Sequence, residues 1–131
     1  MNKPEEIRTM LQGKTIAVIG LSSNPQKPSH YVSSYMQQKG YTIYPVNPTI
    51  ETVLGQRSYP SLTALPIKPD IVNVFRLPNF IPAIVDEMLT LNIKNLWIQL
   101  GIINEAAALK AEAAAIHVVM DRCIMIEHRR R

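Results

Sequence analysis

The chain has 131 residues, with 14 lysines and arginines against 10 acidic residues, 47% hydrophobic residues and a single cysteine. This length suits one domain, because domains cluster at about 100–150 residues, and the apolar content excludes a disordered chain. A single cysteine excludes both an internal disulfide and a cysteine-based zinc site.

The net charge of +4 is concentrated at one end of the chain. Arg129, Arg130 and Arg131 supply three of these charges, and the remaining chain has 11 basic against 10 acidic residues. A nucleic-acid surface needs basic residues spread over one face, so we expect no nucleic-acid binding. We interpret the three arginines as a solvated, frayed terminus, with a local anion contact as the alternative.

The sequence favours a cytoplasmic protein without membrane contact. No segment supplies the run of about 20 apolar residues that spans a bilayer. The first residues, Met1–Gly13, lack the apolar core of a signal peptide. The single cysteine agrees with a reducing compartment.

Helices and short apolar strands alternate in the first half of the chain. We predict a helix over Pro4–Gln12, a strand over Thr15–Ile19, a helix with Ser29 as its N-cap that ends at Gly40, and a strand over Tyr41–Val46. A connection over 49–60 follows, and Ser61–Leu65 is predicted to form one helical turn before Pro66.

The second half continues the alternation. We predict a strand over Asp70–Phe75, an amphipathic helix with Ile81, Ile84, Val85, Met88 and Leu89 on one face, a strand over Asn95–Gln99, an alanine-rich helix capped by Asn104 that runs to about Ala115, and a strand over Ile116–Met120. Residues 121–131 are ambiguous, and we assign them as a C-terminal tail.

This pattern predicts an α/β fold. Because the strands are nearly continuous apolar runs, they belong to a sheet that is covered on both faces. We therefore expect a Rossmann-like, doubly wound, mainly parallel five-stranded sheet with helices on both faces. Residues 1–131 then form a single domain, with the N-terminal helix inside 1–13 and the tail over 121–131.

In such a sheet, ligands bind beyond the carboxyl ends of the strands. The candidate loops are therefore those that follow Ile19, Val46, Val74 and Ile98. The first loop, Gly20–Ser29, leads into a helix, whose N-terminus favours phosphate. Its donors are Ser22, Ser23, Asn24 and Ser29, with the charge of Lys27 beside them. This loop predicts phosphate binding, and the alternative is an ordinary capped turn.

The later loops carry fewer candidates. Arg76 follows the third strand, where its guanidinium is placed to pair with phosphate, although a surface arginine at the sheet edge is the alternative. Gln99 lies at the carboxyl end of the fourth strand and is placed to hydrogen-bond a ligand. We assign Trp97 to the core, because a lone tryptophan on a buried strand usually packs.

Two departures argue against NAD as a redox cofactor. Gly20 alone remains of the three-glycine fingerprint, and the second strand ends in Asn47–Pro48 where a dehydrogenase offers an acid to the ribose. An NAD(P)-linked oxidoreductase therefore remains only an alternative.

Catalytic groups are scarce. His30, His117 and His128 lie on different predicted elements, so we expect no metal site. Asp121, Cys123 and His128 fall within eight residues and form a conceivable nucleophilic set, but Cys123 is more simply interpreted as a buried small residue. We therefore expect that the protein is not an enzyme.

The segment IAVIGLSSNPQKPSHYVSSYMQQKGYTIYPVNP resembles the small stand-alone CoA-binding proteins, as do LGQRSYPSL, VFRLPNFIP, LWIQLGI and VVMDRCIMIEH. These proteins are similar to the CoA-binding domain of the succinyl-CoA synthetase alpha subunit. The resemblance extends from about Thr15 to Arg130. It implies a Rossmann-like domain that binds coenzyme A along the carboxyl edge of its sheet.

The resemblance also implies site residues. It places the phosphate loop at Ser22, Ser23, Asn24 and Pro25, with Lys27 and Ser29 beside it, and the second-strand turn at Asn47 and Pro48. It places Phe75, Arg76 and Pro78 beside the adenine nucleotide, and Ile98, Gln99 and Leu100 beside the pantetheine arm. Gly20 completes the predicted cofactor-binding residues. Leu100 stands where the synthetase has an acid, which argues against catalysis.

We therefore expect non-catalytic binding of coenzyme A or an acyl-CoA. The alternatives are an NAD(P)-linked oxidoreductase and a component of an acyl-CoA ligase, both of them enzymes. The sequence leaves open a homodimer or another protein partner.

Overall fold

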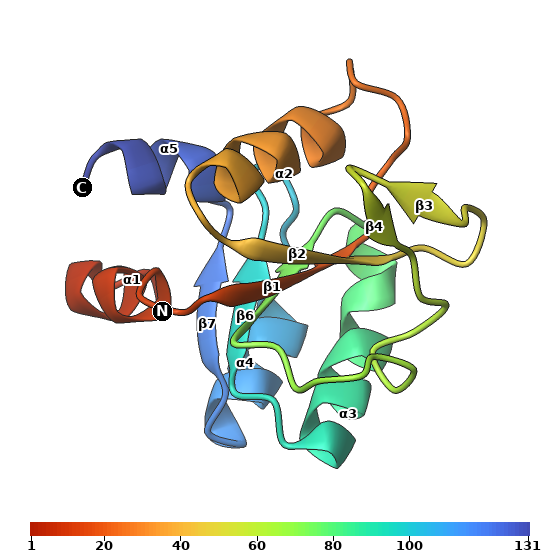
Figure 1. Cartoon of the computed structure of the whole chain (residues 1–131). Coiled ribbons are helices and arrows are strands. Elements are labelled where there is room, and N and C mark those ends of the chain that lie inside the picture. Colours follow the sequence, from red (N-terminus) through yellow and green to blue (C-terminus); the bar gives the residue numbers. More distant parts are fainter.

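The computed structural model describes all residues, Met1–Arg131, and its main feature is a five-stranded parallel sheet between two layers of helices (Figure 1). The strands are β1 (Thr15–Ile19), β2 (Thr42–Val46), β5 (Ile71–Val74), β6 (Asn95–Ile98) and β7 (His117–Met120), in the order β2-β1-β5-β6-β7. β3 (Thr52–Val53) and β4 (Gln56–Arg57) form a separate antiparallel pair in the connection between β2 and β5. The predicted fold class is confirmed.

The helices are α1 (Pro4–Met10), α2 (Pro28–Gln38), α3 (Ile81–Leu91), α4 (Glu105–Ala113) and α5 (Ile124–Arg129), with a short 3-10 helix η1 (Pro78–Phe80) before α3. α1, α2 and α5 cover one face of the sheet, and α3 and α4 cover the other (Figure 1). None of these helices combines the length and the apolar character that a membrane span requires.

Two apolar cores hold these layers together, because alternate residues of each strand point to opposite faces. In β1, Ile16 and Val18 pack with α1, α2 and α5, while Ala17 and Ile19 pack with α3 and α4. Trp97 is fully buried in the core beneath α1, α2 and α5, as predicted.

Three local predictions need correction. Helix α2 begins at Pro28 with Lys27 as its N-cap, because proline suits the first helical position and Ser29 Oγ accepts the Ser22 N–H instead of capping. Residues 61–65 form only a turn with two i→i+3 bonds, because Pro66 cannot continue a helix. The predicted tail contains a helix, α5.

Two of the C-terminal arginines have contacts within the protein. Arg130 and Arg131 both form ion pairs with the buried carboxylate of Glu127 on α5. Each arginine thus has an anionic partner, while both side chains remain solvated, with 67% of Arg130 and 32% of Arg131 exposed.

At the other end of the chain, the side chain of Asn2 pairs with the edge strand β7. Its amide nitrogen donates to the Met120 carbonyl at 2.8 Å, and its amide oxygen accepts the Met120 N–H at 2.8 Å. The terminal amine of Met1 lies 3.0 Å from the Glu112 carboxylate. These contacts fasten the N-terminal segment to β7 and α4.

The chain order creates a switch point between β1 and β5. From β1 the chain crosses to β2 on one side, and it then returns past β1 to β5 on the other. The loops that leave the carboxyl ends of β1 and β5 therefore diverge to opposite faces of the sheet, and a crevice opens between them.

Candidate functional site

A cavity of about 730 Å³ lies at the carboxyl edge of the sheet. Its walls come from the loop after β1, the first turns of α2, the segment from the end of β5 through η1, the loop after β6, and residues 123–126 after β7. The volume falls within the range of about 300–1,000 Å³ that is typical of small-molecule sites.

The structure brings nine of the predicted site residues together around this cavity. These are Gly20, Ser22, Lys27, Ser29, Phe75, Arg76, Pro78, Gln99 and Leu100. They come from three separate stretches of the chain, which follow β1, β5 and β6, so the sheet topology is what assembles them.

The other predicted residues do not line the cavity. Ser23, Asn24 and Pro25 lie exposed at the tip of the first loop. Ile98 is fully buried in the core of the α3 and α4 face. Pro48, exposed, follows Asn47 in the turn after β2.

Asn47 serves the scaffold. Its amide nitrogen donates to the Leu21 carbonyl at 3.0 Å, and its side-chain oxygen accepts the N–H and the hydroxyl of Thr49. Asn47 therefore joins the loop after β1 to the turn after β2, outside the cavity.

Sequence reasoning missed about half of the lining. The additional residues are Pro28, Tyr31, Val32, Leu77, Phe80, Gly101, Ile102, Cys123, Met125 and Ile126. The last three had an available signal, because β7 ends at the same edge as the other parallel strands and its following segment should have been included. Leu77 and Phe80 are apolar yet exposed, which the sequence alone did not indicate.

Gly20 allows β1 and β5 to approach each other closely. Its φ is +88°, and a Cβ there would lie 2.5 Å from the Phe75 carbonyl oxygen and 3.0 Å from Arg76 Cδ. Glycine is the residue that meets both demands, because it accepts positive φ and carries no side chain. The backbone at the switch point therefore depends on this glycine.

The first loop is organised by its own side chains. Ser29 Oγ accepts the Ser22 N–H at 2.9 Å, Ser22 Oγ accepts the Asn24 N–H at 3.0 Å, and Asn24 Oδ1 accepts the Gln26 N–H at 3.0 Å. These predicted ligand donors thus also shape the loop that leads into α2. At this end of α2, Pro28 has no N–H, and the His30 and Tyr31 N–H groups donate to the Lys27 carbonyl, which leaves only the Ser29 N–H without a partner in the protein.

Two cations line the cavity without an acidic partner. Lys27 and Arg76 take part in none of the ion pairs of the structure, and no acidic residue is among the lining residues. The Arg76 guanidinium lies 3.9 Å from the centre of the Phe80 ring, a cation–π distance. Their positive charge is therefore available to an anion.

Gln99 is a buried polar group at the cavity wall, with only 4% of its surface exposed. Its side-chain oxygen accepts the Ile124 N–H at 3.2 Å and the Asn73 amide at 3.3 Å. Its amide nitrogen forms no hydrogen bond within the protein. This nitrogen is not enclosed, because the buried side-chain polar atom left without a partner is Ser33 Oγ, so it can donate to a ligand in the cavity.

The conceivable nucleophilic set is not assembled. Asp121 Oδ1 accepts the Gly101 N–H at 2.8 Å, and His128 Nδ1 pairs with the Tyr35 hydroxyl at 2.8 Å. Cys123 lines the cavity and forms no hydrogen bond with either group. Burial, together with the nearby charge of Lys39, lowers the pKa of His128. No three His, Cys, Asp or Glu side chains gather as metal ligands.

A doubly wound α/β domain with a ligand cavity at its switch point is the class that the fold and this site define. Residues 14–129 match the model of the CoA binding domain family. The chain therefore belongs to the CoA-binding domain family, as its sequence predicted.

Similar proteins span both short and long chains. The uncharacterized protein YneT of Bacillus subtilis is 43% identical over 124 residues, which cover 94% of this chain and 92% of YneT. A solved structure from Thermus thermophilus is 38% identical, with a TM-score of 0.92 and 98% of each chain covered. The ADP-forming acetate–CoA ligase II of Archaeoglobus fulgidus is 30% identical over 91 residues, 68% of this chain but 14% of the ligase.

Proposed function

We propose that this protein binds coenzyme A or an acyl-CoA in the cavity at the switch point, and that it does so without transforming the ligand. The observation that carries the proposal is the pairing of two unpartnered cations, Lys27 and Arg76, with an otherwise uncharged and largely apolar lining. Coenzyme A has the matching division into an anionic nucleotide and an uncharged pantetheine arm.

The phosphates of coenzyme A would be the anionic partners of Lys27 and Arg76. Coenzyme A carries about four negative charges near neutral pH, because it contains a diphosphate and a phosphate monoester. Charge-assisted hydrogen bonds from Arg76 and Lys27 offset part of this charge. The N-terminus of α2 adds one free donor, the Ser29 N–H, and the positive end of a helix dipole. A modest net charge of the whole chain suffices, because this complementarity is local.

The remaining lining suits the pantetheine arm. Leu100, Ile102, Met125 and Ile126 present apolar surface, and the free amide nitrogen of Gln99 is a donor for an amide carbonyl. The arm contains two amide groups separated by short aliphatic segments. Apolar walls with few polar groups are typical of sites that fix the orientation of such a ligand.

The absence of acidic residues from the cavity lining supports a role without catalysis. Asp121 and His128 are engaged elsewhere, so Cys123 has no base within hydrogen-bond reach. The likeness to part of an ADP-forming ligase favours a second candidate, a CoA-binding component of a larger ligase activity. In that case too the residues described here would bind the cofactor while other domains perform the chemistry.

Titration calorimetry with CoA, and with NAD as the paired ligand, tests the proposal. We expect heat and saturation with CoA and none with NAD. Mass spectrometry of the supernatant after denaturation accompanies the titration, because CoA retained during purification would mask binding. A ligand-free protein that is silent towards CoA contradicts the proposal, and saturation by NAD alone favours the oxidoreductase. Loss of acyl-CoA from the mixture over time contradicts the non-catalytic role.

A further inference from the structure

Helix α5 forms one wall of the cavity but contains only six residues. Cys123, which precedes it, and Met125 and Ile126 within it, all line the cavity. A helix this short has no stability of its own, because the cost of nucleation exceeds what a few hydrogen bonds return. The position of this wall therefore depends on what holds α5 against the rest of the protein.

The helix is anchored in part by ordinary contacts. Ile124 is fully buried in the core, its N–H donates to Gln99 Oε1, and His128 pairs with the Tyr35 hydroxyl of α2. The same helix also buries a carboxylate, that of Glu127, which is 6% exposed. A buried carboxylate without a partner is costly and draws the helix towards water.

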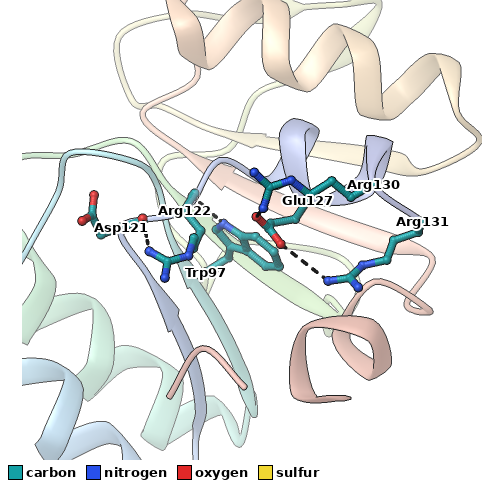
Figure 2. Close-up of polar contacts among 6 residues, drawn as sticks. All are labelled: Trp97, Asp121, Arg122, Glu127, Arg130 and Arg131. Carbon is teal, nitrogen blue, oxygen red and sulfur yellow. Dashed lines mark hydrogen bonds and ion pairs between the residues drawn. The ribbon is translucent and has the colours of Figure 1, made fainter. Parts of the chain in front are cut away.

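Two arginines that follow α5 remove this cost. Arg130 Nη1 lies 3.1 Å from Glu127 Oε2, and Arg131 Nη2 lies 3.5 Å from Oε1 (Figure 2). No other side chain donates to this carboxylate. The arginines themselves remain in contact with water, with 67% of the Arg130 side chain and 32% of the Arg131 side chain exposed.

We propose that Arg130 and Arg131 are positioning residues for the cavity. By neutralising Glu127, they keep α5 docked, and thereby keep Met125 and Ile126 in place as the wall beside Cys123. They act through Glu127 and do not themselves line the cavity. The inference about α5 rests on geometry alone, and only its consequence for affinity rests on the proposed function.

The test uses a double variant that carries both Arg130→Gln and Arg131→Gln. A single variant, Arg129→Gln, is the matched control. Arg129 is an exposed neighbour in the same arginine run and forms no ion pair. The readout that needs no ligand is the rate at which iodoacetamide alkylates Cys123, followed by intact mass. We expect the double variant to react at least about tenfold faster than the wild type, and the control to react at the wild-type rate.

A second variant separates the charge from mere loss of packing. Adding Glu127→Gln to the double variant removes the unpaired carboxylate and should restore slow alkylation. If the double variant fails to fold, we expect the triple variant to recover both the folded state and slow alkylation of Cys123. Wild-type alkylation in the double variant, or no restoration in the triple variant, overturns the inference.

Measuring the affinity for CoA in the same variants tests whether the position of α5 affects the site. We expect a loss of about tenfold in the double variant, recovered in the triple variant, with the control unchanged. If the ligand-free wild type does not bind CoA, the proposed function fails while the alkylation rates still decide the role of the arginines. If CoA binds equally well to all variants, the positioning role is wrong while the proposed function stands.

Discussion

The two faces of the sheet differ in what they bury. The core beneath α3 and α4 consists of apolar side chains only. The other face holds all five buried polar or charged residues: Ser29 and Ser33 in α2, Asn73 in β5, Gln99 directly after β6, and Glu127 in α5. The buried polar residues that line the cavity, Ser29 and Gln99, therefore lie on the α2 and α5 face. Substitutions on the two faces should therefore have separable effects.

Gly20→Val should produce the largest effect, because it acts on the backbone where the site is assembled. Left-handed φ costs a residue with a side chain about 1–2 kcal/mol, and the Cβ also meets the Phe75 carbonyl. We expect a loss of stability beyond that strain and no measurable CoA binding. Gly40→Val is the control, since Gly40 has φ +102° but open space around it. Thermal denaturation and calorimetry of both variants check this. Wild-type affinity in the Gly20 variant would exclude the nucleotide-site model.

Leu96→Ala should lower stability while sparing the site. Leu96 is fully buried on β6 and faces α3 and α4. Truncation of such a leucine costs about 2–5 kcal/mol. Urea denaturation should record that loss, and CoA affinity, measured where the variant is folded, should remain near the wild-type value. A large loss of affinity at unchanged m-value would show that the two faces are more strongly coupled than their composition indicates.

Lys27→Ala and Arg76→Ala should lower the affinity for CoA while sparing stability. Neither cation has an ion pair to lose, so we expect little change in unfolding free energy and about a tenfold loss of CoA affinity for each.

Phe80→Leu should give a smaller loss of CoA affinity, because it removes the ring that holds the Arg76 guanidinium but keeps an apolar wall. In an Arg76→Ala background the Phe80 effect should disappear. Calorimetry at two salt concentrations measures these affinities. Unchanged CoA affinity in the Lys27 and Arg76 variants would show that the phosphates do not bind beside these two residues.

The smallest effect concerns His128 and the contact between α5 and α2. Burial lowers its pKa in the folded protein below the ordinary 6.5. The unfolded chain therefore takes up the proton first as the pH falls, and the unfolding free energy should decrease from about pH 7 downwards until the folded-state pKa is passed. His128→Gln should lose this component, whereas His117→Gln, at an exposed position of β7, should keep it. Urea denaturation at pH 7.5 and pH 5 compares them.

The fold was predictable because its signals are local and repeated. Each buried strand, such as Thr15–Ile19, is a short apolar run between turn residues, and parallel pairing follows from the alternation with helices. Helix ends were harder where a proline and a serine compete, as at Pro28 and Ser29. Residues 121–131 gave no clear pattern because α5 depends on tertiary anchors such as Ile124 and Glu127.

The site was predictable only in part. Gly20, Lys27, Arg76 and Gln99 stand directly after strands or at a helix start, where the topology alone places them at one edge. Phe80 and Ile126 were missed because their contribution depends on how η1 and α5 fold back over that edge. The resemblance placed Asn47 in the site, whereas its side chain hydrogen-bonds to Leu21 and Thr49 outside the cavity.

The side-chain pair between Asn2 and β7 bears on aggregation. An edge strand exposes unpaired backbone groups on which another chain can add as a further strand. Asn2 occupies both the N–H and the carbonyl of Met120, so an incoming strand finds that position already taken. At the opposite edge, Tyr59 takes a similar place, since its N–H donates to the Pro45 carbonyl of β2 and its own carbonyl accepts the Asn47 N–H. Both margins of the sheet are thus obstructed by residues from outside it, which disfavours edge-to-edge polymerisation.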